Sequence, residues 1–248
     1  MIIWITVFLV LAGVPVFICI DSPWLAHYFP YGQGVDNVIM IFAYSWIFII
    51  SNKRLRWLMV LMTLCSLCAE TIGSQLLTLY RYRLDNIPVY IPLGHAVLYA
   101  TVYQICRQRL VWFYHKEIES CLIKSAFVAS FLSLFLIRDI AGFLGYLFCL
   151  VILRFVKKPI FYLYMFTVVY YIELCGTVIG TWSWYGVLGN HPAYPSIGKA
   201  PSGMAGIYIL FDLISNFFYI YGRKVGRFFY YFIVRKPRYR FFADARLN

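Results

Sequence analysis

Long apolar stretches separated by short polar segments run through the whole chain. Most are roughly 17–23 residues long, the length at which a helix crosses the hydrocarbon core of a bilayer. The first stretch has neither a basic leader nor a small-residue cleavage site, so we expect it to be retained. The pattern predicts an all-α integral membrane protein with about eight transmembrane helices, at about 1–20, 35–50, 57–79, 87–106, 121–137, 140–156, 159–180 and 204–221.

Composition and charge agree with this pattern. The 248 residues are 62% hydrophobic and 13% charged, with a mean hydropathy of +0.75, which excludes an ordinary soluble domain. An eight-span topology places nearly all of the 22 Lys and Arg residues on one side of the membrane. The positive-inside rule then predicts a multi-pass protein of a bacterial inner or plasma membrane, with both termini in the cytoplasm. The residues on the other side are Arg81, Arg83, Arg138 and Lys199.

The two halves of the chain share a sequence pattern. A Glu-x-x-Gly-[Ser/Thr] motif begins at Glu70 and recurs 103 residues later at Glu173. A Pro-x-Gly-x-Ala-x-[Leu/Ile]-Tyr motif begins at Pro92 and recurs at Pro201, which implies a six-residue insertion between the motifs of the second copy. We therefore predict two parallel four-helix repeats, 1–120 and 121–222, followed by a basic cytoplasmic tail, 223–248.

Acidic side chains inside apolar spans are the first candidates for function, because a carboxylate in a bilayer is costly. We predict Glu70, Glu173 and Asp212 as catalytic residues, together with His95 on the fourth span. In this interpretation the motif glycines admit a neighbouring helix, and the following hydroxyls bond the carboxylates. The structural alternative pairs the glutamates with Arg81, Arg83 or tyrosine hydroxyls and makes His95 an interhelical hydrogen-bonding residue. Asp36 and Asp139 stand at span starts, where we expect helix N-caps.

Aromatic residues make up 21% of the chain, more than an interfacial belt requires. Aromatic walls suit flat apolar ligands and stabilise cations. A carboxylic acid in such a chamber can protonate an alkene, and the rings can stabilise the resulting carbocation. We predict a substrate-binding set formed by Tyr80, Tyr82, Tyr99, Tyr103, Trp182, Trp184 and Tyr208.

The stretch from Glu70 to Tyr99, with Tyr80-x-Tyr82 and the segment 87–92, resembles the membrane carotenoid hydratases of the bisanhydrobacterioruberin hydratase type. The resemblance covers about 30 residues, and the second copy departs from that pattern. It implies a lipophilic isoprenoid or carotenoid-like substrate and hydratase, cyclase or isomerase chemistry without a cofactor.

Two other classes stay open. A proton-coupled transporter also combines duplicated spans with membrane carboxylates, and a non-catalytic assembly factor would use the basic tail for docking. Metal binding is not predicted, because the four histidines are dispersed and Cys65-x-x-Cys68 has no second ligand pair. The expected partners are the lipid bilayer, a lipophilic small molecule and, at the basic tail, anionic lipid head groups rather than nucleic acid.

Overall fold

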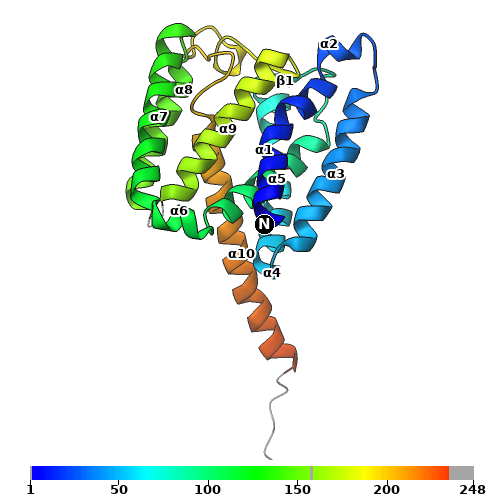
Figure 1. Ribbon diagram of the computed structural model, residues 1–248, viewed down its shortest axis with the longest axis vertical. Helices are drawn as coiled ribbons and strands as arrows, with labels where there is room; N and C mark the ends of the chain where they lie inside the picture. The colour runs from blue at the N-terminus through cyan, green and yellow to red at the C-terminus, as the bar shows by residue number, and fades with distance from the viewer. Residues whose placement is uncertain (1, 157–158, 235–248) are drawn as a thin grey trace, which may run out of the picture.

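The computed structural model of the chain describes residues 2–156 and 159–234, which are almost entirely α-helical (Figure 1). A helix lies at each of the eight predicted spans: α1 (Ile2–Ile20), α3 (Gly32–Ile50), α4 (Lys53–Glu70), α5 (Tyr90–Ile105), α7 (His115–Leu136), α8 (Ile140–Phe155), α9 (Pro159–Ile179) and α10 (Met204–Val234). Shorter elements join them: α2 (Pro23–Ala26), a π-helical turn η1 (Thr71–Leu76), α6 (Arg109–Phe113) and a 3₁₀ turn η2 (Leu188–Asn190).

Within the described residues, five helices are long and apolar enough to cross a membrane. They are α1, α3, α4 continued by η1, α7 and α9, and α8 is a shorter apolar helix. This confirms the prediction of a helical protein with several membrane-spanning segments.

The helices form two groups with α9 and α10 between them (Figure 1). On one side α5 packs against α1, α3 and α4; on the other, α7 packs on α8 and α9. Helix α10 contacts α4, α8 and α9, while α1 lies against α9. Ala96 and Ala100 of α5 are fully buried against Leu58 and Met59 of α4, because small side chains let two helices approach closely.

Two element ends differ from the prediction. Helix α10 continues to Val234 and so includes the first part of the predicted tail 223–248, while residues 235–248 lie outside the described residues. Helix α3 begins at Gly32 with Tyr31 as its N-cap, so the prediction that Asp36 caps a helix is wrong. The prediction for Asp139 is confirmed, because its side chain accepts a hydrogen bond from the Gly142 amide at the start of α8.

Two short strands join the halves of the chain. Strand β1 (Tyr80–Tyr82) follows η1, and strand β2 (Trp182–Trp184) follows α9. They pair antiparallel, with Arg81 opposite Ser183 at the centre. A hydrogen bond from the Arg83 amide to the Thr181 carbonyl extends the pairing. The ribbon holds the segments that follow Glu70 and Glu173 side by side.

Candidate functional site

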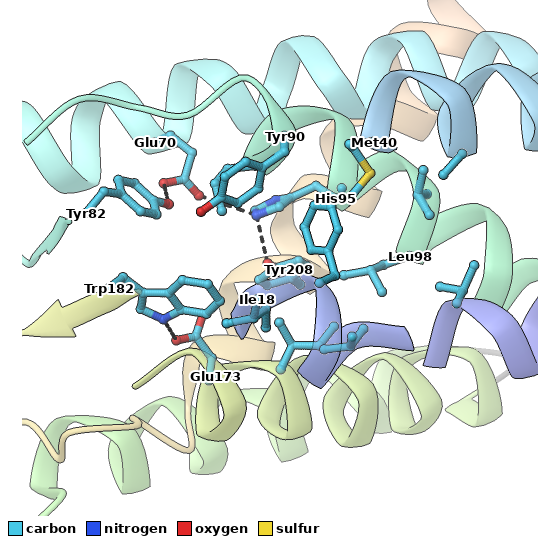
Figure 2. A pocket seen from close by; sticks show the side chains of 18 of the residues that line it. Ile18, Met40, Glu70, Tyr82, Tyr90, His95, Leu98, Glu173, Trp182 and Tyr208 are labelled. Atoms are coloured by element: carbon cyan, nitrogen blue, oxygen red, sulfur yellow. Dashed lines mark hydrogen bonds and ion pairs between the residues drawn. The ribbon is translucent and has the colours of Figure 1, made fainter. Parts of the chain in front are cut away.

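An apolar cavity of about 830 Å³ lies beneath the β1–β2 ribbon. Helices α1, α3 and α5 form most of its wall, α4, α9 and α10 complete it, and both glutamates line it. Figure 2 shows Glu70 and Glu173 on opposite walls, pointing toward the space between them. The structure therefore brings the two predicted carboxylates into one chamber.

Phenolic donors surround the Glu70 carboxyl. Its Oε2 accepts hydrogen bonds from the hydroxyls of Tyr80 at 2.7 Å and Tyr82 at 2.5 Å, while Oε1 lies 3.4 Å from Nε2 of His95. Burial and the neighbouring carboxylate raise the pKa of the Tyr80 and Tyr82 phenols, so both stay protonated as donors. The tyrosine pairing weighed as the structural alternative is thus present.

Indole donors surround the Glu173 carboxyl instead. Its Oε2 accepts hydrogen bonds of 3.0 Å from Nε1 of Trp182 and of Trp184. Among the described residues, no donor bonds the other oxygen, Oε1. An indole N–H donates but cannot accept, whereas a phenol does both. The two carboxyls therefore have equivalent positions in the chain but chemically different partners.

The ribbon places these donors in register. Tyr80 pairs with Trp184 and Tyr82 with Trp182. We call each glutamate with its two aromatic donors a carboxylate cage. Because antiparallel strands are related by a local twofold rotation, the donors of the two cages are related in the same way. The Tyr80 and Trp184 rings lie 4.6 Å apart between centroids. Because each strand carries the donors for one glutamate, a shift in register would disturb both cages together.

The motif glycines explain how these rings reach the helices. A Cβ added at Gly176 would lie 2.0 Å from Cζ2 of Trp182, and one added at Gly73 would lie 2.9 Å from the Tyr80 hydroxyl. Each glycine thus makes room for the first aromatic of its own strand, and the prediction that it admits a neighbouring helix is wrong. The hydroxyls of Ser74 and Thr177 bond the backbone carbonyls of Glu70 and Glu173, so the predicted bonds to the carboxylates are also wrong.

His95 connects Glu70 to the second half of the chain. Its Nε2 lies 2.9 Å from the Tyr208 hydroxyl, and the two rings stack with centroids 4.7 Å apart. Both residues line the cavity, with Tyr208 contributed by α10 (Figure 2). The buried Nδ1 of His95 has no hydrogen-bond partner among the described residues. Nε2 of His95 therefore faces both the Glu70 carboxyl and the Tyr208 hydroxyl, and Tyr208 holds the imidazole beside Glu70.

Three predicted site residues lie outside the cavity. Asp212 is buried between α9 and α10, where it accepts hydrogen bonds from Tyr162 at 2.7 Å and Asn216 at 2.6 Å. Tyr99 faces that same carboxylate, and Tyr103 accepts a hydrogen bond from Arg107. His95, Tyr99 and Tyr103 are spaced four residues apart and share one face of α5. This face extends past the end of the cavity, so His95 lines the cavity and the two tyrosines do not.

The sequence did not identify the buried ion pair that joins the end of α1 to the residue after β1. Asp21 is buried beside α1, where Arg83 forms an ion pair with it and the Tyr90 hydroxyl donates to it at 2.9 Å. Arg83 therefore pairs with Asp21 and not with either glutamate, while Arg81 is exposed. The only sequence signal is that Arg83 and Asp21 are charges placed at the ends of apolar stretches.

The cavity approaches the surface of the helix bundle along α1 and α3. Several of its lining side chains are also exposed on the outside of the bundle: Leu9 on α1 and Ile39, Phe42 and Trp46 on α3. Trp46 donates a 3.4 Å hydrogen bond to Thr6, which links the two helices. This wall is apolar, as is the lipid that surrounds a membrane-spanning helix.

Among the described residues, no three His, Cys, Asp or Glu side chains are grouped as metal ligands would be. No protein-family model matches the chain, and no curated protein or solved structure has significant similarity to it. Functional inference therefore rests on the cavity and its two carboxylate cages.

Proposed function

We propose that this chain is an eight-span membrane protein, built from two parallel repeats, with both termini in the cytoplasm. Helices at all eight predicted spans support the count, although α5 and α8 are short. The two carboxylate cages, each a glutamate bonded by the first and third residues of the following strand, support the repeat. The basic segments around α6 and at the end of α10 support the orientation.

The proposed substrate is an elongated apolar molecule of the isoprenoid or carotenoid type. A cavity of about 830 Å³ is within the size range of small-molecule sites, and its wall is apolar except near the glutamates. A lipophilic substrate would enter from the bilayer past α1 and α3, because the lining residues there are exposed toward lipid. Its reactive double bond would lie between Glu70 and Glu173.

The two cages suit different charge states. Glu173 is held by two groups that only donate, which favours its ionised form. Its Oε1, which no donor bonds among the described residues, faces the chamber next to the Trp182 and Trp184 rings. We assign Glu173 to stabilising a carbocation, because a preorganised charge in an apolar site interacts strongly with a developing opposite charge.

Glu70 is the better proton donor. The phenols and the imidazole around it can donate or accept, so they accommodate either form of the carboxyl. The imidazole beside it is held in place by the Tyr208 hydroxyl. We assign Glu70 as the general acid and His95, held by Tyr208, as the group that positions it.

The proposed hydration balances with water as the second substrate. The acidic proton of Glu70 adds to one alkene carbon, the π bond breaks, and the positive charge develops on the other carbon facing Glu173. Water then forms the new C–O bond, and its proton returns to the Glu70 carboxylate. Cyclisation or isomerisation would follow the same first step, with an internal alkene attacking the cation or a neighbouring carbon losing its proton.

The observation that carries this proposal is the pair of opposed carboxyls with unlike donors across one apolar cavity. The test is chromatography of the pigments of polyene-producing cells that express the wild type, E70Q or E173Q. Both substitutions preserve shape and an oxygen acceptor, so both variants should fold. We expect a new product with the wild type alone, and an unchanged profile with all three would refute the proposal.

A proton-coupled carrier is the second candidate. Asp212 is a further buried acid, about one turn beyond Tyr208 on α10, and it accepts hydrogen bonds from Tyr162 and Asn216. Such a series of buried polar groups suits proton movement along α10 toward its basic end. Proton-driven uptake into liposomes that is lost in D212N, without any chemical change of the solute, would favour the carrier over the enzyme.

A further inference from the structure

A second hollow lies at the opposite end of the molecule from the ribbon. It encloses about 340 Å³ and is lined by the first residues of α4 and the middle of α10, namely Lys53, Arg54, Trp57, Tyr219 and Arg223. In the proposed topology this is the cytoplasmic face. The site shares no residue with the cavity that contains the glutamates.

Its three basic side chains form no direct ion pair within the described residues, although the Arg54 charge is near enough to act on the buried Asp212 carboxyl. Within the described residues, Lys53, Arg54 and Arg223 form no ion pair and donate no hydrogen bond. The two guanidinium groups approach the same ring, with Cζ of Arg54 5.8 Å and Cζ of Arg223 5.7 Å from the Tyr219 centroid. Like charges gathered around one ring repel each other, and a bound anion would remove that repulsion.

The nearby Arg56 differs from these basic residues because its guanidinium is engaged in hydrogen bonds to the backbone. Its guanidinium donates hydrogen bonds to the carbonyls of Phe48, Ile49 and Ser51, and so satisfies the carboxyl end of α3. Arg54, two residues earlier, has no such structural role. The start of α4 adds the positive end of a long helix dipole beside Lys53.

The aromatic residues indicate where an anion at this site would come from. Trp57 lies one turn into α4 and is about half exposed, as expected for an indole at the membrane interface. An anion held by Lys53, Arg54 and Arg223 would therefore lie at headgroup depth. A lipid bound there could extend its acyl chains past Trp57 along the apolar surface of the bundle.

We propose that Lys53, Arg54 and Arg223 bind the phosphate of an anionic phospholipid in the cytoplasmic leaflet, with Trp57 and Tyr219 framing its glycerol backbone. Basic pockets between membrane helices on this side are suited to such head groups. The site fixes α10 to the start of α4 through a lipid. It is independent of the chemistry proposed for the cavity.

The test measures lipid binding by native mass spectrometry of the full chain in detergent. Phosphatidylglycerol is compared with phosphatidylcholine, and sn-glycerol 1-phosphate is the soluble probe. We compare R54Q/R223Q with the matched control K224Q/R227Q, which removes the same charge from exposed positions of α10 outside the pocket. We expect R54Q/R223Q to bind phosphatidylglycerol about thirtyfold more weakly, equivalent to about 2 kcal/mol for two basic residues. The control should bind like the wild type.

Four results would overturn the proposal. Equal losses in both double variants would show only general surface charge. Equal binding of phosphatidylcholine by the wild type would remove the need for an anionic lipid, and equally tight binding of glycerol phosphate would assign the site to a soluble anion. If R54Q/R223Q does not fold, R54K/R223K keeps the charges and should retain the preference for phosphatidylglycerol, and its loss of that preference would contradict the proposal.

Discussion

Tyr82 on β1 lies directly opposite Trp182 on β2, and each donates a hydrogen bond to a different glutamate. The two residues are 100 positions apart in the chain, yet one ladder of backbone pairing fixes both. Because the strands have only three residues each, the ribbon depends on packing against the helices below it. The geometry of the two cages is therefore coupled, and a substitution that displaces the donors of one cage should also displace those of the other.

Gly176→Ala should destabilise the protein more than Gly73→Ala. The added methyl group would lie 2.0 Å from the Trp182 ring, which the strand holds in place, but 2.9 Å from the terminal hydroxyl of Tyr80. We expect a cost of about 1–3 kcal/mol for Gly176→Ala, the usual range for overpacking. Thermal unfolding in detergent measures the difference, and tryptophan fluorescence should report movement of Trp182. Equal unfolding temperatures for the two variants would contradict this account of the glycines.

Asp139→Asn should destabilise the protein, whereas Asp36→Asn should not. Asp139 accepts four hydrogen bonds, from the amides of Gly142, Gly198 and Ser202 and from the Ser202 hydroxyl. An asparagine NH₂ group would face two of these donors, so we expect a loss of about 2–4 kcal/mol.

Asp36 is fully buried, but neither carboxylate oxygen has a partner among the described residues. Its substitution by Asn loses no hydrogen bond and should leave stability within about 0.5 kcal/mol or raise it. Urea or thermal unfolding of both variants provides the measurement. A strongly destabilised Asp36→Asn would show that Asp36 holds a structural partner.

Gly13→Phe should block the cavity without harming the fold. A Cβ added at Gly13 would meet no atom within 4 Å, and the residue lines the cavity on α1. Gly34 on α3 is equally open but does not line the cavity, so Gly34→Phe is the matched control. We expect substrate conversion to fall at least tenfold in Gly13→Phe only, with similar unfolding temperatures for both variants. Full conversion by Gly13→Phe would place the substrate elsewhere.

Tyr208→Phe should slow the reaction while preserving substrate binding. The ring stacked on His95 remains, but the hydroxyl 2.9 Å from Nε2 is lost. Losing the bond that holds the imidazole beside Glu70 should lower the maximal rate about 10–100-fold with little change in KM. The measurement is the initial rate of conversion in isolated membranes, together with its solvent isotope effect. Tyr103→Phe outside the cavity serves as the control, and equal rates for the two variants would remove Tyr208 from the mechanism.

Local sequence was enough to locate the helices. Length and hydropathy determine where a helix can cross lipid, so all eight predicted segments contain one. Glu70 and Glu173 were identified for the same reason, because buried carboxyls are costly wherever the chain folds. The aromatic residues after them were expected near the substrate, and they line the cavity.

Long-range contacts were not predictable from the same information. Nothing local indicates that β1 pairs with β2, or that α1 lies against α9 and supplies a cavity wall. Asp36 and Asp139 look alike in sequence. Among the described residues, however, Asp36 has no hydrogen-bond partner, whereas Asp139 joins the segment before α10 to the start of α8, because their surroundings come from distant segments. Tyr99 and Tyr103 share a helix face with His95 but extend beyond the cavity, whose depth the sequence does not encode.

The π-helical turn after Glu70 has a consequence for the history of the two halves. Tyr80 follows Glu70 by 10 residues, whereas Trp182 follows Glu173 by 9. Both helices then end at a residue with left-handed backbone, Thr78 and Gly180, two positions before the strand. A π turn accommodates one additional residue by widening the helix. In the proposed repeat, one half would thus have absorbed a single-residue length change inside the membrane, while its glutamate and its strand kept their relative positions.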